Sequence, residues 1–303
     1  MNFSNIVMTD RYEYMVIVID FLISVFILTA VGKVTGLVSN VKSVHELSEK
    51  DNFSFGISYA AAILAVGIML TGALSGDVTI SLVYEMSIVA AYGVLGIFLM
   101  TVTRHFLDRV SLPRISIHEQ IVKGNSAAGI VDAANMLATA IIVRSVMIWV
   151  DTESFNGLLI VLAGFIFSQL LMVLVTRYRL FVYAKRHQGQ NLQLAFEEGN
   201  IALALRYFGH KIGVALAVTA ASGIASYTEG QVAESVMLWA AVSLGLTIGL
   251  SLLSIVARHV ILWGINVVEE VDVQRNIGIG FIECIIYIAN GVLLVALFGI
   301  SNS

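Results

Sequence analysis

Four ionisable side chains lie inside apolar stretches of the sequence, where they could bind a proton or a cation. Asp132 lies in "GIVDAANML" and Glu283 in "GFIECII", and His210 and Lys211 are adjacent in "YFGHKIGVA". An ionisable group in a membrane span is costly, so we expect each of them to face the protein interior and to find a partner. We predict that these residues form one charged cluster, for which two alternative roles remain. The acids exchange protons or cations, tuned by the bases, or the cluster sets helix packing and register.

Depth along the expected helices separates the buried charges into two layers. At 1.5 Å per residue, Asp132 and Glu283 lie about 9 Å from one membrane face, and the two bases lie about 13 Å from it. A second set is expected about 8 to 10 Å from the opposite face and comprises Asp20, Glu85 and Arg144. Asp132 and Arg144 share a helix but are separated by about 18 Å, so each must be matched by another helix. Arg206 is nearer the membrane edge, where we expect it to reach the interface.

Further polar residues stand where the apolar runs end. Two runs end in the similar fragments "TRHFL" and "ARHVI", and asparagine precedes two others. Headgroup contacts are expected for these residues, with recognition of a lipid or protein partner as the alternative. The predicted interface set is Arg104, His105, Arg258, His259, Asn125 and Asn276.

Motifs of the common enzyme and metal sites are missing from the sequence. "HEQIV" and "HELSE" each begin like a zinc-protease helix but lack the second histidine. The chain has no Gly-x-Ser-x-Gly elbow and no phosphate-binding glycine loop. Its single cysteine, Cys284, cannot form a disulfide framework or a cysteine metal site within the chain. We therefore expect no enzymatic activity, no cofactor and no metal.

The composition predicts an integral membrane protein with an all-α fold. Of 303 residues, 58% are hydrophobic and only 13% are charged, whereas roughly a quarter of a soluble domain is charged. The net charge of -4 comes without a long basic arm, so nucleic acid is not an expected partner. A bilayer core needs about 20 apolar residues in a helix. The predicted spans are Tyr14 to Val34, Phe53 to Ser75, Ile80 to Thr101, Ser126 to Val150, Phe155 to Thr176, Ile201 to Ser226, Val232 to Ala257 and Ile277 to Ile300.

The distribution of Lys and Arg predicts the orientation of these eight spans. The segments after spans 1, 3, 5 and 7 hold Lys33, Lys42, Lys50, Arg104, Arg109, Arg114, Lys123, Arg177, Arg179, Lys185, Arg186, Arg258 and Arg275. The other side, which includes both termini, holds only Arg11. Because translocated loops are depleted in basic residues, both termini should face outward, which is the periplasm in a bacterium.

The sequence also matches itself at a shift of about 150 residues. Residues 1–151 and 152–303 are therefore expected to form two four-helix repeats in parallel orientation, because each contains an even number of spans. The matched pairs are Asn52 with Asn200, Tyr59 with Tyr207, Arg104 with Arg258, His105 with His259, Glu119 with Glu270, Asn125 with Asn276, Gly129 with Gly280 and Asp132 with Glu283. The acid recurs in both halves, whereas His210 and Lys211 stand opposite Ala62 and Ile63. This recurrence favours a functional role for the acid over a purely structural one.

Each half resembles the small four-helix bacterial inner-membrane proteins of the YjfL type, a family of unknown function. The segments that carry the resemblance are "GNSAAGIVDAANMLATAI" and "DNFSFGISYAAAILAVG". The resemblance covers most of both halves, although the second half reads "RNIGIGFIECIIYIANG" where the first keeps Asn-Ser-Ala-Ala-Gly. It implies an inner-membrane, multi-pass location and an association with membrane-stress genes, but no mechanism.

Two functions fit these observations. The first is a membrane scaffold whose basic cytoplasmic loops dock a peripheral protein or lipid, with another copy of the chain as a further partner. Those loops are charged and partly amphipathic, as "RHFLDRVSLPRISIHEQIVK" shows. The alternative is a permeation or transport element for protons or cations that uses Asp132 and Glu283. A water-filled path to these acids would favour the second function.

Overall fold

A computed structural model describes residues 11–38, 41–75, 82–150 and 157–299. All regular structure within these ranges is helical, and eight helices are long and apolar enough to cross a membrane, which confirms the all-α expectation. The long helices are α1 (Arg11–Val38), α2 (Phe53–Ala73), α3 (Leu82–Phe106), α5 (Ser126–Val150), α6 (Gly157–Arg186), α8 (Ile201–Ile224), α9 (Val232–Ile261) and α10 (Ile277–Phe298). Short helical segments connect them: η2 (His45–Glu49), η3 (Leu107–Ser111), α4 (Ile117–Val122), α7 (Leu192–Glu197) and η4 (Glu269–Val273).

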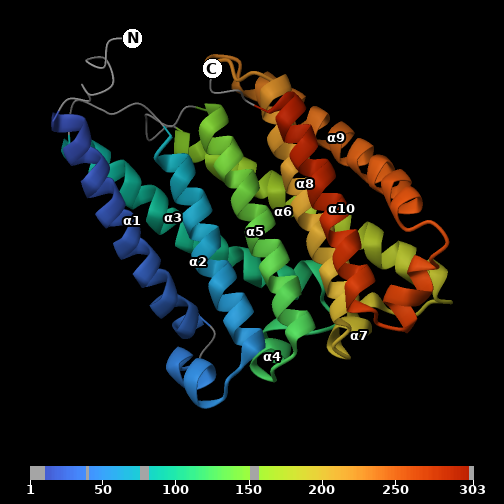
Figure 1. Ribbon diagram of the computed structural model, residues 1–303. Helices are drawn as coiled ribbons and strands as arrows, with labels where there is room; N and C mark the ends of the chain where they lie inside the picture. The colour runs from blue at the N-terminus through green and yellow to red at the C-terminus, as the bar shows by residue number, and fades with distance from the viewer. Residues whose placement is uncertain (1–10, 39–40, 76–81, 151–156, 300–303) are drawn as a thin grey trace, which may run out of the picture.

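Helices α2, α5, α8 and α10 form a row in chain order (Figure 1). Each of them packs extensively against the next, and these contacts are the largest between helices of the protein. Three further long helices flank this row in a regular way, because α3 packs on α2, α6 on α5 and α9 on α8. Helix α1 packs on both α2 and α3. Helices α5 and α8 lie in the middle of the row and are therefore the most buried of the spans.

Four helices, α1, α3, α6 and α9, continue past the predicted ends of their spans, and α6 does so by the most. Helix α6 continues to Arg186, ten residues past the expected end at Thr176, and α9 continues to Ile261 instead of Ala257. The segment "RYRLFVYAKR" at the end of α6 contains no glycine or proline, and a left-handed glycine, Gly189, follows shortly after it. Hydropathy falls at the first arginine, but the helix ends only where the backbone can turn.

The row helices begin in the same way, with an asparagine cap preceded by a left-handed residue. The side-chain oxygen of each asparagine accepts a hydrogen bond from a backbone N–H in the first turn, which satisfies a donor that the helix leaves unpaired. The four left-handed and cap pairs are Asp51–Asn52, Gly124–Asn125, Gly199–Asn200 and Arg275–Asn276. We call the end of the bundle where these four asparagines lie the asparagine end.

Glycines near this end allow neighbouring row helices to approach at backbone distance. A side chain at Gly129 would meet the carbonyl oxygen of Ser54 at 2.7 Å, and a side chain at Gly280 would overlap the carbonyl oxygen of Ala202. Gly129 and Gly280 occupy the same place in α5 and α10, four residues after the cap asparagine. The small residue is required at both places because backbone atoms, which cannot move aside, occupy the space.

Replacement of Gly280 by Ala should therefore destabilise the protein. The added methyl group would push α10 away from α8, and overpacking of this kind costs about 1 to 3 kcal/mol. The matched control is Gly245→Ala on α9, where no atom lies within 4 Å of the added carbon. Thermal unfolding of the purified protein in detergent should show a lower midpoint for Gly280→Ala and an unchanged or higher one for Gly245→Ala. Equal midpoints for the two variants would contradict the close approach.

Candidate functional site

Asp132 is a buried carboxylate on α5 with a hydroxyl group and a guanidinium beside it. Its side chain is only 4% exposed. Ser58 on α2 donates to Oδ2 of Asp132 at 2.5 Å, and Nε of Arg104 on α3 lies 3.4 Å from the same oxygen. Nη2 of Arg104 also donates to Oγ of Ser58 at 2.9 Å. Three helices thus meet at one carboxylate, and the guanidinium contacts it at ion-pair rather than hydrogen-bond distance.

A cavity of about 320 Å³ reaches this carboxylate from the asparagine end. Its wall is formed by α2, α3, η3, α4 and α5 and includes Phe55, Ser58, Thr101, Arg104, His105, Asp108, Arg109, Ser116, Ile117, His118, Glu119, Ile121 and Asp132. Arg109 and Glu119 in this wall are exposed, whereas Asp132 is buried. Asp108 holds α4 in place, because its Oδ1 accepts a hydrogen bond from the backbone N–H of Ile117 at 3.1 Å. The cavity therefore connects the buried acid to the protein surface through a wall rich in titratable groups.

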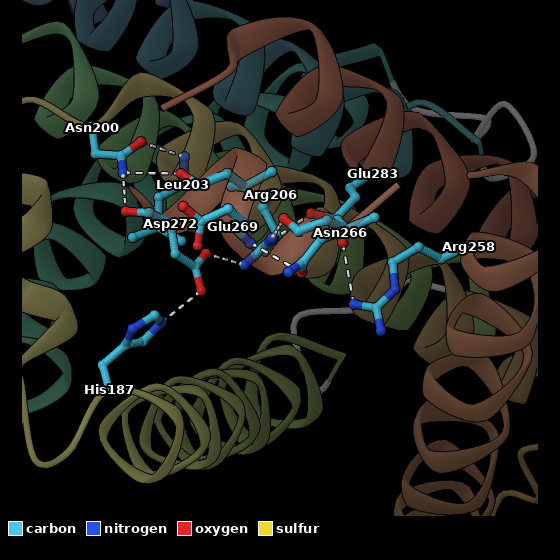
Figure 2. Close-up of polar contacts among 11 residues, drawn as sticks. His187, Asn200, Leu203, Arg206, Arg258, Asn266, Glu269, Asp272 and Glu283 are labelled. Carbon is cyan, nitrogen blue, oxygen red and sulfur yellow. Dashed lines mark hydrogen bonds and ion pairs between the residues drawn. The ribbon is translucent and has the colours of Figure 1, made fainter. Parts of the chain in front are cut away.

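Glu283 on α10 has a different environment, in which both carboxylate oxygens are bonded by arginine. Nε of Arg206 on α8 donates to Oε2 at 2.5 Å, and Nη1 of Arg258 on α9 donates to Oε1 at 3.2 Å. Arg206 also donates to Asp272 at 2.5 Å, and Asp272 lies 2.8 Å from Nε2 of His187. Figure 2 shows Arg206 between the two acids, with His187 and Arg258 at the ends of the network.

Neither of the cavities that adjoin this network reaches Glu283. The one beside Arg206 and Asp272 measures about 30 Å³, and an open groove of about 500 Å³ lies beside Arg258. A carboxylate with two guanidinium partners is well satisfied in a low-dielectric interior. Glu283 therefore connects α8, α9 and α10 to one another, whereas Asp132 faces a cavity.

The two acids nevertheless occupy corresponding places. Each lies seven residues after its cap asparagine, and each is met by the arginine of the similar fragments "TRHFL" or "ARHVI". The difference comes from the helix that precedes each acid in the row. Ser58 lies six residues after Asn52, and Arg206 lies six residues after Asn200. The small hydroxyl of Ser58 leaves space beside Asp132, whereas the larger guanidinium of Arg206 occupies the space beside Glu283.

The predicted bases of the inner cluster have other contacts. Nζ of Lys211 donates to the backbone carbonyl of Met172 at 2.6 Å and lies 5.2 Å from the centre of the Tyr207 ring. The ring of His210 lies 4.1 Å from the ring of Tyr287. The hydrogen bonds and ion pairs of the described residues join neither base to an acid. Arginine takes the role expected for these bases, because its long planar side chain reaches a carboxylate on a neighbouring helix.

The expectation that Arg206 reaches the interface is wrong. The residue is 7% exposed, and its guanidinium donates to Glu283, Asp272 and the carbonyl of Val267. Burial is tolerated because two carboxylates compensate the charge. The alignment of the two halves places Arg206 opposite Ser58, and the structure shows that each of the two contacts the acid of its own half.

Of the predicted outer cluster, Asp20 is buried on α1, and Nε of Arg144 donates to Thr71 on α2 at 2.8 Å. Glu85 belongs to α3, but its side chain lies outside the described part of the structure. The outer cluster as a whole stays a prediction.

The predicted interface residues fall into three groups. The arginines Arg104 and Arg258 turn inward to the two acids, with side chains 17% and 14% exposed. His105 and His259 are exposed at the surface. Asn125 and Asn276 cap α5 and α10. His105, His259 and Asn276 are exposed and are therefore the members of this set that can meet a headgroup or a partner directly.

Glu46 is a buried carboxylate outside the membrane spans. It accepts hydrogen bonds from Lys50 at 2.7 Å and from Asn52 at 2.9 Å. The hydrogen bond from Lys50 is the main reason why the pKa of Glu46 is lowered from its usual value. A lowered pKa in the folded state contributes stability above the unfolded value, and this contribution is lost as the pH falls through the folded pKa. The cap of α2 is therefore expected to weaken in acid.

These features define an all-α, multi-pass membrane protein with a buried charge centre at one end of the bundle. The chain belongs to the DUF350 family, a domain of unknown function, whose sequence profile matches residues 9–147, 81–221 and 152–298. Successive matches begin 72 and 71 residues apart, which is the length of one pair of long helices with its connection.

One curated relative is described as a UPF0719 transmembrane protein from Aquifex aeolicus (strain VF5). It is 25% identical over 99 residues, which is 33% of this chain and 37% of the relative. The match thus covers little more than a third of the relative's length. No solved structure matches the chain.

The cavity makes a direct prediction about solvent access. Ser58 lines it, so the thiol of Ser58→Cys should react with a small water-soluble methanethiosulfonate reagent. Unmodified protein provides a low background, because its one cysteine, Cys284, is 2% exposed. The control is Ser168→Cys, at a buried position that is not in the cavity wall. Equal labelling of the two thiols, measured by mass spectrometry, would show that the cavity does not admit water.

The arginine network makes a prediction about stability. Glu283→Gln leaves Arg206 and Arg258 facing a neutral amide, and loss of one partner from a buried ion pair typically costs about 3 to 5 kcal/mol. Glu269→Gln changes an exposed acid of the neighbouring segment and serves as the control. The thermal midpoint should fall for Glu283→Gln and stay within the error of the native protein for Glu269→Gln. A neutral effect at Glu283 would rule out its role as the connection between α8, α9 and α10.

Proposed function

We propose that this protein is a permeation element of the membrane that binds and releases protons or small cations at Asp132. The observation that supports it most is the cavity of about 320 Å³ that reaches this buried carboxylate. An ionisable group within a span is a functional candidate by default, because a charge is costly to place in the membrane and the ones found there usually serve a function. Here the charge also has a route to water.

The contacts of Asp132 suit reversible binding. The carboxylate has one short hydrogen bond from a neutral hydroxyl and a more distant guanidinium, and it faces open volume. A proton or a cation can approach it without displacing a bonded arginine. His105, His118 and Asp108 in the cavity wall offer further groups for a proton to visit on its way.

Glu283 is assigned a structural role in this proposal. Both of its oxygens are bonded to guanidinium groups, and no cavity wall contains it among the cavities described. Exchange of a proton or a cation there would require two arginines to move. We therefore restrict the permeation hypothesis, which first included both Asp132 and Glu283, to Asp132.

The proposal places the asparagine end at the cytoplasmic side of a bacterial inner membrane, with both termini outward. The basic residues that favour this orientation precede the long helices of the row, and translocated segments are depleted in such residues. We further propose that residues 1–151 and 152–303 are parallel repeats. The corresponding places of Asp132 and Glu283, and of Gly129 and Gly280, support this arrangement. The role is non-enzymatic and needs no cofactor or metal.

A scaffold that docks lipid or a peripheral protein is the second candidate. It is favoured by an open groove at the end of α9 whose wall includes His259 and Trp263. Trp263 is 86% exposed, and tryptophan is enriched where a membrane meets water. Arg104 and Arg258, expected as docking residues, are occupied by the acids, so this function rests on fewer residues than the sequence suggested.

The deciding experiment is ion flux into liposomes that contain the purified protein. A potassium diffusion potential set with valinomycin should drive protons inward, as reported by an enclosed pH dye, or should drive a cation reported by a matching dye. Asp132→Asn should reduce this flux to the level of protein-free liposomes, and Asp132→Glu should retain part of it. The control Glu198→Gln changes an exposed acid that pairs with Arg275.

Folding of each variant is checked by its thermal midpoint and its elution from a sizing column. The permeation proposal fails if the native protein shows no flux of protons or sodium above protein-free liposomes and no flux of potassium in liposomes prepared without valinomycin. It also fails if a folded Asp132→Asn protein conducts as well as the native one. The scaffold function would then be the remaining candidate.

A further inference from the structure

The cap asparagines connect successive helices of the row. Their side-chain amides donate to consecutive backbone carbonyls in the short segment that precedes the next helix of the row. The pairs are Asn52 with Ile121 and Val122, Asn125 with Phe196 and Glu197, and Asn200 with Val271 and Asp272, at 2.9 to 3.5 Å. Three successive contacts of the same kind thus run along the row in one direction.

Asn276, at the start of the last helix, has no such successor among the described residues. Its side-chain amide donates to Glu270 of its own connecting segment at 2.8 Å, and the residue is exposed. The amide of the fourth asparagine therefore bonds its own connecting segment, where the amides of the first three bond the segment before the next helix.

The apolar surfaces of the row show the same direction. Helix α8 contacts α10 through a stripe that includes Ala202, Gly209, Gly213 and Leu216. Counted from the cap asparagine, the corresponding positions of α10 are Gly278, Ile285, Ala289 and Val292. All four are exposed, and none is charged. Helix α10 thus places uncharged residues, on its exposed side, at the positions that α8 uses to hold α10, with Ile285 and Ala289 where α8 has Gly209 and Gly213.

The first helix of the row carries the matching surface. The stripe of α10 that α8 receives consists of Gly280, Cys284, Tyr287 and Gly291, all buried. The corresponding positions of α2 are Gly56, Ala60, Ile63 and Gly67, and they are exposed or half-exposed. Leu47 and Leu28 cover this side only in part, because they would touch a carbon added at Gly56 and Gly67 at ordinary van der Waals distances of 3.8 and 3.9 Å. Small residues at the first and last of these positions allow the close approach seen between α8 and α10.

We propose that the open side of α10 binds the open side of α2 in a second copy of this chain. In the register that joins α8 to α10, Gly278 of one copy meets Gly56 of the next. Ile285 then meets Ala60, a larger residue against a smaller one, where Gly209 meets Cys284 within the chain. It is a head-to-tail contact between two different surfaces, which generates a ring or an open array rather than a two-fold dimer. The inference stands independently of the permeation proposal.

Disulfide cross-linking in native membranes tests this contact. Two differently tagged copies are expressed together in a Cys284→Ala background, one with Gly278→Cys and the other with Gly56→Cys. Oxidation should give a cross-linked species that carries both tags. The matched control replaces Gly56→Cys by Gly245→Cys, at another open glycine of a long helix.

A blocking variant provides the second measurement. Gly278→Trp adds bulk at an exposed position, so the thermal midpoint should be kept while the assembly dissociates to single chains in nanodiscs. The proposal is overturned if Gly278→Cys couples to Gly56→Cys no better than to Gly245→Cys, which would mean that lipid covers α10. It is also overturned if Gly278→Cys couples only to itself, because that result indicates a two-fold contact.

Discussion

A carboxylate withdrawn from water must be met by donors or by a cation, and this requirement organises the asparagine end of the bundle. Asp132 and Glu283 project from α5 and α10 at the same distance from their caps, and each draws in the arginine at the end of a flanking helix. An unmatched buried charge costs several kcal/mol. The last turns of α3 and α9 are therefore tied to the row by charge, and the short segments that follow them are held near the acids.

One side chain on the preceding helix changes what this arrangement can do. Where Ser58 stands, the acid has a small neutral donor and open volume beside it. Where Arg206 stands, the guanidinium fills the corresponding region and extends the contacts to Asp272 and His187. The same backbone frame thus supports an accessible acid in one half and a closed ion-pair network in the other. Under the proposed function, the first half keeps an accessible acid while the second contributes to stability.

The row of helices is directional, and this sets it apart from a closed bundle. Each inner helix shows one surface to its predecessor and a different one to its successor, while the asparagine caps fix the height at which neighbours meet. Glycine on one surface and a backbone carbonyl on the other give the contact its register. A row of this kind necessarily ends in two unlike surfaces, on α2 and on α10. These surfaces can meet lipid or another protein, whereas the middle helices α5 and α8 are mostly buried.

The amino-acid sequence by itself determined the eight spans, because the thickness of a hydrocarbon layer sets the length of an apolar run. It also indicated which acids must be matched, and its internal similarity aligned Asp132 with Glu283 and Arg104 with Arg258. The sequence could not predict which base meets which acid. Lys211 and His210 lie close to Glu283 in depth, yet Arg206 and Arg258 reach it instead.

Only the tertiary structure decided these partners, because the direction of a side chain depends on the rotation of its helix and on how closely its neighbours approach. Both are set by contacts between residues that are distant in the chain, such as Gly280 with Ala202. The cavity beside Asp132 also depends on the tertiary structure, since it is the volume that five segments of the chain leave unfilled. A sequence states which groups need a partner, and the packing of the whole chain selects the partner and the space around it.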